Sequence, residues 1–152
     1  MLLEQGHADR AIAPLNEAWR LSGHDPTIGE RLAQAYYATR DVSRADLIAG
    51  QVLEANPASL TMLHMKARLC LARGDTRGAI AFLERARTAA PRSIETERML
   101  AALYSENGDT DKAIAALERC IQLEPDVPEL QVAYGEMLMV AGRADDAEAA
   151  FK

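Results

Sequence analysis

The 152-residue chain contains few aromatic side chains, few cysteines and no excess of basic charge. Aromatic residues make up 5% of it and alanine, a strong helix former, is the commonest residue, which excludes an all-β sandwich. The net charge of −6 argues against nucleic-acid binding, because phosphate contacts need clustered basic residues. No apolar run approaches the roughly 18 residues that span a bilayer, and the N-terminus does not resemble a signal peptide. We expect a soluble helical protein, with the cytoplasm favoured over the periplasm and the compartment otherwise open.

Residue types that act in catalysis or metal binding do not occur at the spacings that these functions require. The two cysteines, Cys70 and Cys120, stand in apolar helical contexts and are interpreted as packing residues. The three histidines have no partner at a metal-ligand spacing, and no nucleophile elbow or phosphate loop occurs. Carboxylates at 95, 97, 145 and 146 fall near predicted helix N-termini, where the helix dipole favours them, with an acid/base pair as the alternative. The sequence predicts no enzyme and no catalytic, cofactor or metal site.

An internal repeat of 34 residues runs through the whole chain. One column of the repeat holds only alanine, another holds mostly glycine, and a third holds proline in three copies. These columns are Ala11, Ala45, Ala79, Ala113 and Ala147; Gly6, Arg40, Gly74, Gly108 and Gly142; and Pro57, Pro91 and Pro125. A fixed period without insertions indicates a stack of equivalent structural units.

The pattern within each unit predicts two antiparallel helices. Apolar residues recur at helical spacing from 60 to 73, and Gly74 follows at a position typical of a helix end. A second apolar stripe then runs to 89, and Pro91 stops that helix. The alanine column and a facing small column, Ala33, Ala67, Ala101 and Gly135, would let the two helices approach closely.

This pattern resembles the tetratricopeptide repeat family, whose unit has this length and the spacing Trp-x-x-Leu-Gly-x-x-Tyr, Ala-x-x-x-Phe, Pro. The signature is carried in one unit by Leu100, Ala101, Tyr104, Ala113, Leu117 and Pro125, and in the last by Tyr134, Gly135, Leu138, Ala147 and Phe151. The resemblance implies an all-α, right-handed α-solenoid of antiparallel helix pairs. Its single array over 1–152 would comprise a partial unit 1–25, full units 26–59, 60–93 and 94–127, and a partial unit 128–152. Inner helices are expected near 27–39, 60–73, 94–107 and 128–141, and outer helices near 8–21, 42–55, 76–89, 110–123 and from 144 onward.

Several positions depart from the family pattern. Arg40 replaces a turn glycine, which costs roughly 1 kcal/mol in left-handed geometry. Pro14 lies inside the first outer helix and should kink it. Gly29, Glu97 and Gln131 replace a large apolar residue near the start of their inner helices, so we expect burial between repeats to be lost there.

The chain begins inside an expected inner helix and ends inside an outer one, without the polar cap that stacked repeats need. We therefore expect a segment of a longer array. Alternatively, the ends pair with another chain and give weak self-association.

In the resembling family, partners bind the concave groove lined by inner-helix residues that point away from the packing columns. The corresponding residues here are Glu30, Gln34, Tyr37, His64, Arg68, Leu71, Arg98, Ala102, Ser105 and Glu136. His64, Arg68 and Arg98 would form a small basic spot able to hold a carboxylate of a protein or peptide partner, unless neighbouring acids such as Glu95 neutralise it. The Lys and Asn residues with which one subgroup clamps acidic C-terminal tails are absent at these positions.

The resemblance predicts a non-catalytic protein–protein interaction scaffold that binds a peptide or partner segment in this groove. Two alternatives stay open: a substrate-recognition region of a larger enzyme similar to glycosyltransferases or sulfotransferases, and an adaptor in an envelope or secretion assembly. A related helical-repeat family reads RNA, but its units are typically one residue longer and its arrays are basic, so we expect no nucleic-acid partner.

Overall fold

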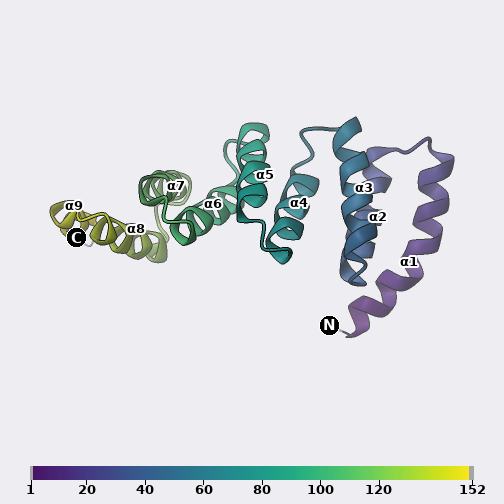
Figure 1. The fold of residues 1–152 in the computed structure, drawn as a ribbon, viewed down its shortest axis with the longest axis horizontal. Coiled ribbons are helices and arrows are strands. Elements are labelled where there is room, and N and C mark those ends of the chain that lie inside the picture. Colours follow the sequence, from purple (N-terminus) through teal and green to yellow (C-terminus); the bar gives the residue numbers. More distant parts are fainter. Residues whose placement is uncertain (1, 151–152) are drawn as a thin grey trace. The chain divides into compact units, whose positions relative to one another are not determined.

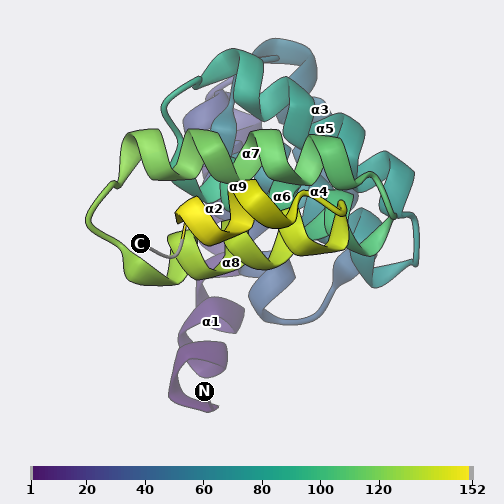
Figure 2. The same ribbon diagram turned by 90° about the vertical axis from the view of Figure 1, so that its left-hand side faces the viewer.

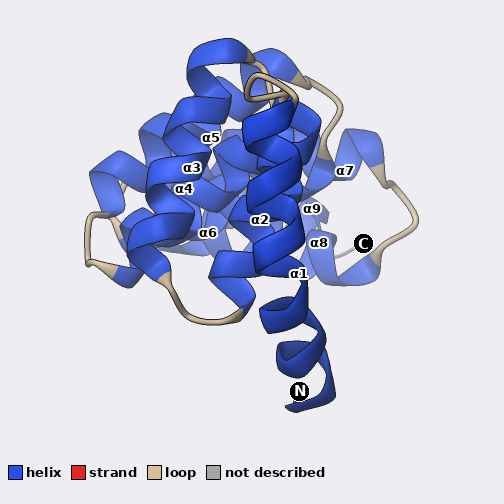
Figure 3. Ribbon diagram, turned by 90° about the vertical axis from the view of Figure 1, so that its right-hand side faces the viewer, coloured by secondary structure: helices blue, strands red, loops and turns tan. Residues whose placement is uncertain are grey.

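The computed structural model describes the backbone of residues 2–150 and the side chains of 8–148 and 150. Within that range the chain forms helices joined by short loops, with no strand (Figure 3). The chain divides into two compact units, one ending at Asp75 and the other beginning at Thr76. In each unit, helices that are consecutive in sequence pack against one another. The predicted all-α fold of successive helix pairs is therefore confirmed.

The predicted helix boundaries agree with the structure to within one residue from the second helix to the eighth. Unit 1 contains α1 (Leu2–Leu21), α2 (Pro26–Ala38), α3 (Val42–Ala55) and α4 (Leu60–Ala72), shown in purple to teal in Figure 1. Unit 2 contains α5 (Thr76–Ala89), α6 (Ile94–Glu106), α7 (Thr110–Leu123), α8 (Pro128–Val140) and α9 (Ala144–Ala150). Figure 2 shows α7, α8 and α9 of unit 2, of which α8 packs against both α7 and α9.

The turns at Gly74, Gly108 and Gly142 share one geometry. After α4, Asp75 N–H donates to the carbonyl of Cys70 at 2.9 Å and Gly74 N–H to that of Leu71 at 2.9 Å, the two bonds of a Schellman motif. Gly74 has φ +75°, and Gly108 and Gly142 repeat this conformation. Arg40 occupies the equivalent position with φ 64°, so the strain predicted for this residue is present.

The small-residue columns lie at the helix contacts. Ala45, Ala79 and Ala113 are fully buried and Ala147 nearly so. Ala33 and Ala67 of the facing column are also fully buried. A methyl group at these points brings the helix backbones together, and the larger side chains on either side complete the core.

Helix α1 differs from the repeat pattern. The glycine column predicts a turn at Gly6, but α1 continues through this residue and through Pro14 to Leu21, and it bends along its length (Figure 1). Continuing the helix keeps its backbone groups hydrogen-bonded, whereas a single interior glycine costs about 1 kcal/mol. Pro14 lies inside this helix, and its ring cannot sit against an undistorted preceding turn.

Gly29 does not reduce burial between α1 and α2, contrary to the sequence prediction. An added Cβ at Gly29 would lie 2.5 Å from Cγ2 of Val52 and 3.0 Å from Nε1 of Trp19. Trp19 is 8% exposed and its ring meets the His24 ring edge-on at 4.4 Å. The Trp19 indole of α1 and the Val52 side chain of α3 thus occupy the volume that a large residue at position 29 would otherwise fill.

Candidate partner-binding surface

In unit 1, the predicted groove residues lie on α2 and α4. Gln34, Tyr37 and Arg68 are exposed, with 39% of Tyr37 accessible, whereas Glu30 and Leu71 are half-buried and His64 is buried. Glu30 is tied to the start of α4, because the Ser59 hydroxyl donates to its carboxylate at 2.5 Å. Ser59 also caps α4 by accepting from the Met62 N–H. That Arg98 stands beside His64 and Arg68 stays a prediction.

In unit 2, the structure brings the four remaining predicted residues, Arg98, Ala102, Ser105 and Glu136, to one pocket of about 380 Å³ between α6, α7 and α8. The other lining residues, which were not predicted as site residues, are Ala101, Leu117, Ala133, Met137 and Val140. This volume lies within the range of small-ligand and side-chain pockets. Most of the lining is apolar, and the polar groups are few.

The helical spacing of residues on α8 could have identified three of the lining residues that were not predicted. Ala133, Met137 and Val140 follow one another by four and three residues, so they share one side of the helix with Glu136. Leu117 carried no such signal. It belongs to a packing column, is 7% exposed, and reaches the pocket from the outer helix α7.

The two charged residues of the pocket have different surroundings. An Nη2–H of Arg98 donates to Oε2 of Glu124 at 3.0 Å, and both side chains are about half exposed. Among the residues that the structure describes, Glu136 forms no ion pair. The charge of Arg98 is therefore balanced within unit 2, as the alternative interpretation of the basic spot expected, although by Glu124.

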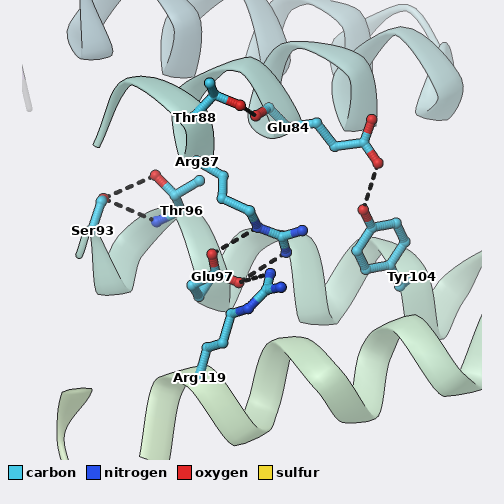
Figure 4. Close-up of polar contacts among 8 residues, drawn as sticks. All are labelled: Glu84, Arg87, Thr88, Ser93, Thr96, Glu97, Tyr104 and Arg119. Carbon is cyan, nitrogen blue, oxygen red and sulfur yellow. Dashed lines mark hydrogen bonds and ion pairs between the residues drawn. The ribbon is translucent and has the colours of Figure 1, made fainter. Parts of the chain in front are cut away.

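Glu97 is a structural ion-pair residue. Its side chain is 1% exposed, and Arg87 of α5 donates to both carboxylate oxygens, at 2.7 and 2.8 Å (Figure 4). Arg119 of α7 approaches the same carboxylate at 3.7 Å. The prediction that burial is lost at Glu97 is wrong. Arg87 from the preceding helix packs against the Glu97 carboxylate and neutralises its charge. Gln131, the third substituted position, is half-buried.

Two other buried groups are held in their neutral forms. Burial raises the pKa of the Cys120 thiol to about 11, and the charge of Glu97 adds to this. Burial also raises the pKa of Tyr104 to about 12, helped by the hydrogen bond that its hydroxyl donates to Glu84 at 2.7 Å (Figure 4). Cys120 therefore is not a reactive thiolate at neutral pH.

The described residues contain neither a cluster of metal ligands nor a membrane-spanning helix. No group of three or more His, Cys, Asp or Glu side chains in this part of the chain is placed to hold a metal ion. Between residues 2 and 150, no helix combines the length and apolar character needed to cross a membrane.

Comparison with known proteins gives one family. The tetratricopeptide repeat model matches residues 2–69, 70–119 and 104–152. Similar solved structures include MamA from Desulfovibrio magneticus RS-1, with 23% identity and a TM-score of 0.77 over 98% of this chain and 84% of that one. A second MamA crystal structure gives 20% identity and a TM-score of 0.82 over 97% of this chain and 86% of that one. No curated protein matches the chain.

Proposed function

Because the chain belongs to the tetratricopeptide repeat family, we propose that it is a non-catalytic scaffold that binds a peptide or partner segment on its inner helices. Membership of this family supports a general protein-binding role, since its members are generally interaction scaffolds without catalysis. The finer proposal is that the inner helices carry the binding surface of each unit, α2 and α4 in unit 1 and α6 and α8 in unit 2.

The observation that carries the proposal is the pocket of unit 2. It is lined mainly by the inner helices α6 and α8, most of its lining is apolar, and Ala102 and Ser105 contribute small side chains. Val140, one of the lining residues, is 72% exposed, and Val132 and Met139 of the same helix are 47% and 62% exposed. Exposed apolar side chains around a pocket with few polar groups are typical of a site that receives a partner's side chain.

Filling the pocket tests this proposal. Random dodecapeptides displayed on phage are selected on the full chain, and the affinity of the enriched peptides is measured for two tryptophan variants. Ala102→Trp places an indole in the pocket, whereas Ala115→Trp places it on the exposed side of α7. We expect Ala102→Trp to weaken binding at least tenfold and Ala115→Trp to leave it unchanged, with equal helicity by circular dichroism. Equal binding by both variants would refute the proposed site.

The carboxylate-binding role of the basic spot is a separate proposal. If a partner carboxylate binds at Arg68 of unit 1 or at Arg98 of unit 2, Arg68→Glu or Arg98→Glu, respectively, abolishes binding of acidic peptides while helicity is kept. Unchanged binding of acidic peptides assigns both arginines to a solvated face.

Weak self-association through the chain ends would appear as a concentration-dependent mass in sedimentation equilibrium, and a single mass at all concentrations would exclude it.

The two other settings, the recognition region of a larger enzyme and an adaptor in an envelope or secretion assembly, require the same binding step. The tryptophan variants therefore test the step that all three functions share.

A further inference from the structure

The exposed face of α8 combines acidic and apolar side chains. At 3.6 residues per turn, Glu129, Val132, Ala133, Glu136, Met139 and Val140 fall on one side of the helix, and Leu130 and Leu138 fall on the opposite, buried side. We call the first set the α8 face. Glu136 lies near its centre, with Val132 and Met139 on one flank and Ala133 and Val140 on the other.

Within the described part of unit 2, no basic side chain pairs with the carboxylates of this face. Its two inner helices, α6 and α8, carry one basic residue, Arg98, which is paired with Glu124. In the described part of the chain, neither Glu129 nor Glu136 forms an ion pair. Arg119 is directed to Glu97 and Arg143 to Asp146. The pocket therefore has an apolar floor and an unneutralised carboxylate at its edge.

From this arrangement we propose that the α8 face and its pocket bind a basic, apolar peptide segment. An aliphatic side chain of the segment enters the pocket, and an adjacent Lys or Arg side chain donates to the Glu136 carboxylate. The proposal rests on the proposed function and names its partner chemistry. Charge complementarity selects a cationic partner, because an acidic segment would face Glu129 and Glu136 across apolar surface that excludes water. Met137 and Met139 are flexible and polarizable, so they can adapt to different aliphatic side chains.

The composition of selected peptides is the first test. Random dodecapeptides on phage are selected on the full chain, and the sequences are scored for Lys or Arg within four residues of Leu, Ile, Val or Met. We expect enrichment of this pattern over the starting library. Enrichment of acidic or uncharged peptides whose binding Ala102→Trp abolishes would overturn the partner chemistry but keep the proposed function. Absence of enrichment, or peptides that bind Ala102→Trp equally well, would overturn both.

A double-mutant cycle is the second test. The affinity of the best peptide and of its Lys/Arg→Gln form is measured by fluorescence anisotropy on the unmodified chain and on Glu136→Gln. Either change alone should weaken binding about tenfold, and the two together should weaken it by little more. Glu54→Gln, an exposed position on the outer helix α3, serves as the matched control and should have no effect. Full additivity of the two changes would contradict contact between the peptide cation and Glu136.

Discussion

The ion pair between Arg87 and Glu97 makes a stability prediction that can be worked out from the structure. In Glu97→Leu, Arg87 loses both of its hydrogen bonds to the carboxylate, at 2.7 and 2.8 Å, in a site where only a quarter of its side chain is exposed. Removing one partner of a buried pair costs about 3–5 kcal/mol because the other charge is left uncompensated. Since Arg87 keeps some access to water and Arg119 is half exposed, we expect the lower end, about 3 kcal/mol.

Replacing both members of the ion pair with leucine should restore the stability that Glu97→Leu loses. The equivalent residues one repeat earlier are Leu53 and Leu63, which are 8% and 0% exposed. The double variant Arg87→Leu/Glu97→Leu reproduces that pair, and we expect its stability to lie within about 1 kcal/mol of the unmodified chain.

Urea denaturation followed by far-UV circular dichroism measures both variants, with the slope of the transition checked for constancy. Glu106→Leu, which changes an exposed glutamate of the same helix, is the control and should shift stability by less than about 0.5 kcal/mol. An unchanged midpoint for Glu97→Leu, or a double variant no more stable than the single one, would refute the assignment.

Three further predictions concern the fold. Ala113→Leu should destabilise the chain by about 1–3 kcal/mol through overpacking, since Ala113 is fully buried; its denaturation midpoint would show this. Arg40→Gly should stabilise it by about 1 kcal/mol because φ at this position is 64°, so a lower melting temperature would count against the strain. The pKa of Tyr104 is raised to about 12, mainly by burial and then by Glu84; its contribution to stability is therefore complete below pH 10 and is lost as the pH rises through about 12. Tyr104→Phe should flatten this part of the pH–stability curve, and an unaltered curve would contradict the shift.

Most of the helical framework followed from local signals in the sequence. Helical spacing of apolar residues, glycine at the turns and proline between units indicate paired helices, because each signal acts over a few neighbouring positions. The bounds of α2 to α8, which the resemblance to the tetratricopeptide repeat implied, agree with the structure to within one residue. The continuation of α1 through Gly6 was missed, since one glycine does not end a helix whose backbone bonds can continue.

The packing between successive helices could not be predicted by comparing equivalent positions of the repeats one at a time. Gly29 and Glu97 each look like a loss of packing when compared with the same position in other repeats. Each is explained by a residue ten positions earlier on the preceding helix, Trp19 in one case and Arg87 in the other. The candidate site was predicted in part for a related reason: spacing along α6 and α8 identifies residues that face one way, but only packing shows that Leu117 of α7 reaches the same pocket.

The ion pair of Arg87 with Glu97, and the leucines at the equivalent positions 53 and 63, also bear on how such an array can evolve. Repeats of equal length invite unequal recombination, in which one whole unit is lost without disturbing the period. Deleting residues 60–93 from this chain would join α3 to α6 and place Leu53 at the position from which Arg87 now neutralises Glu97. The product would leave the buried Glu97 carboxylate with Leu53 in place of Arg87 and would be less stable. The different chemistry at these two equivalent places thus opposes loss of residues 60–93 from this chain.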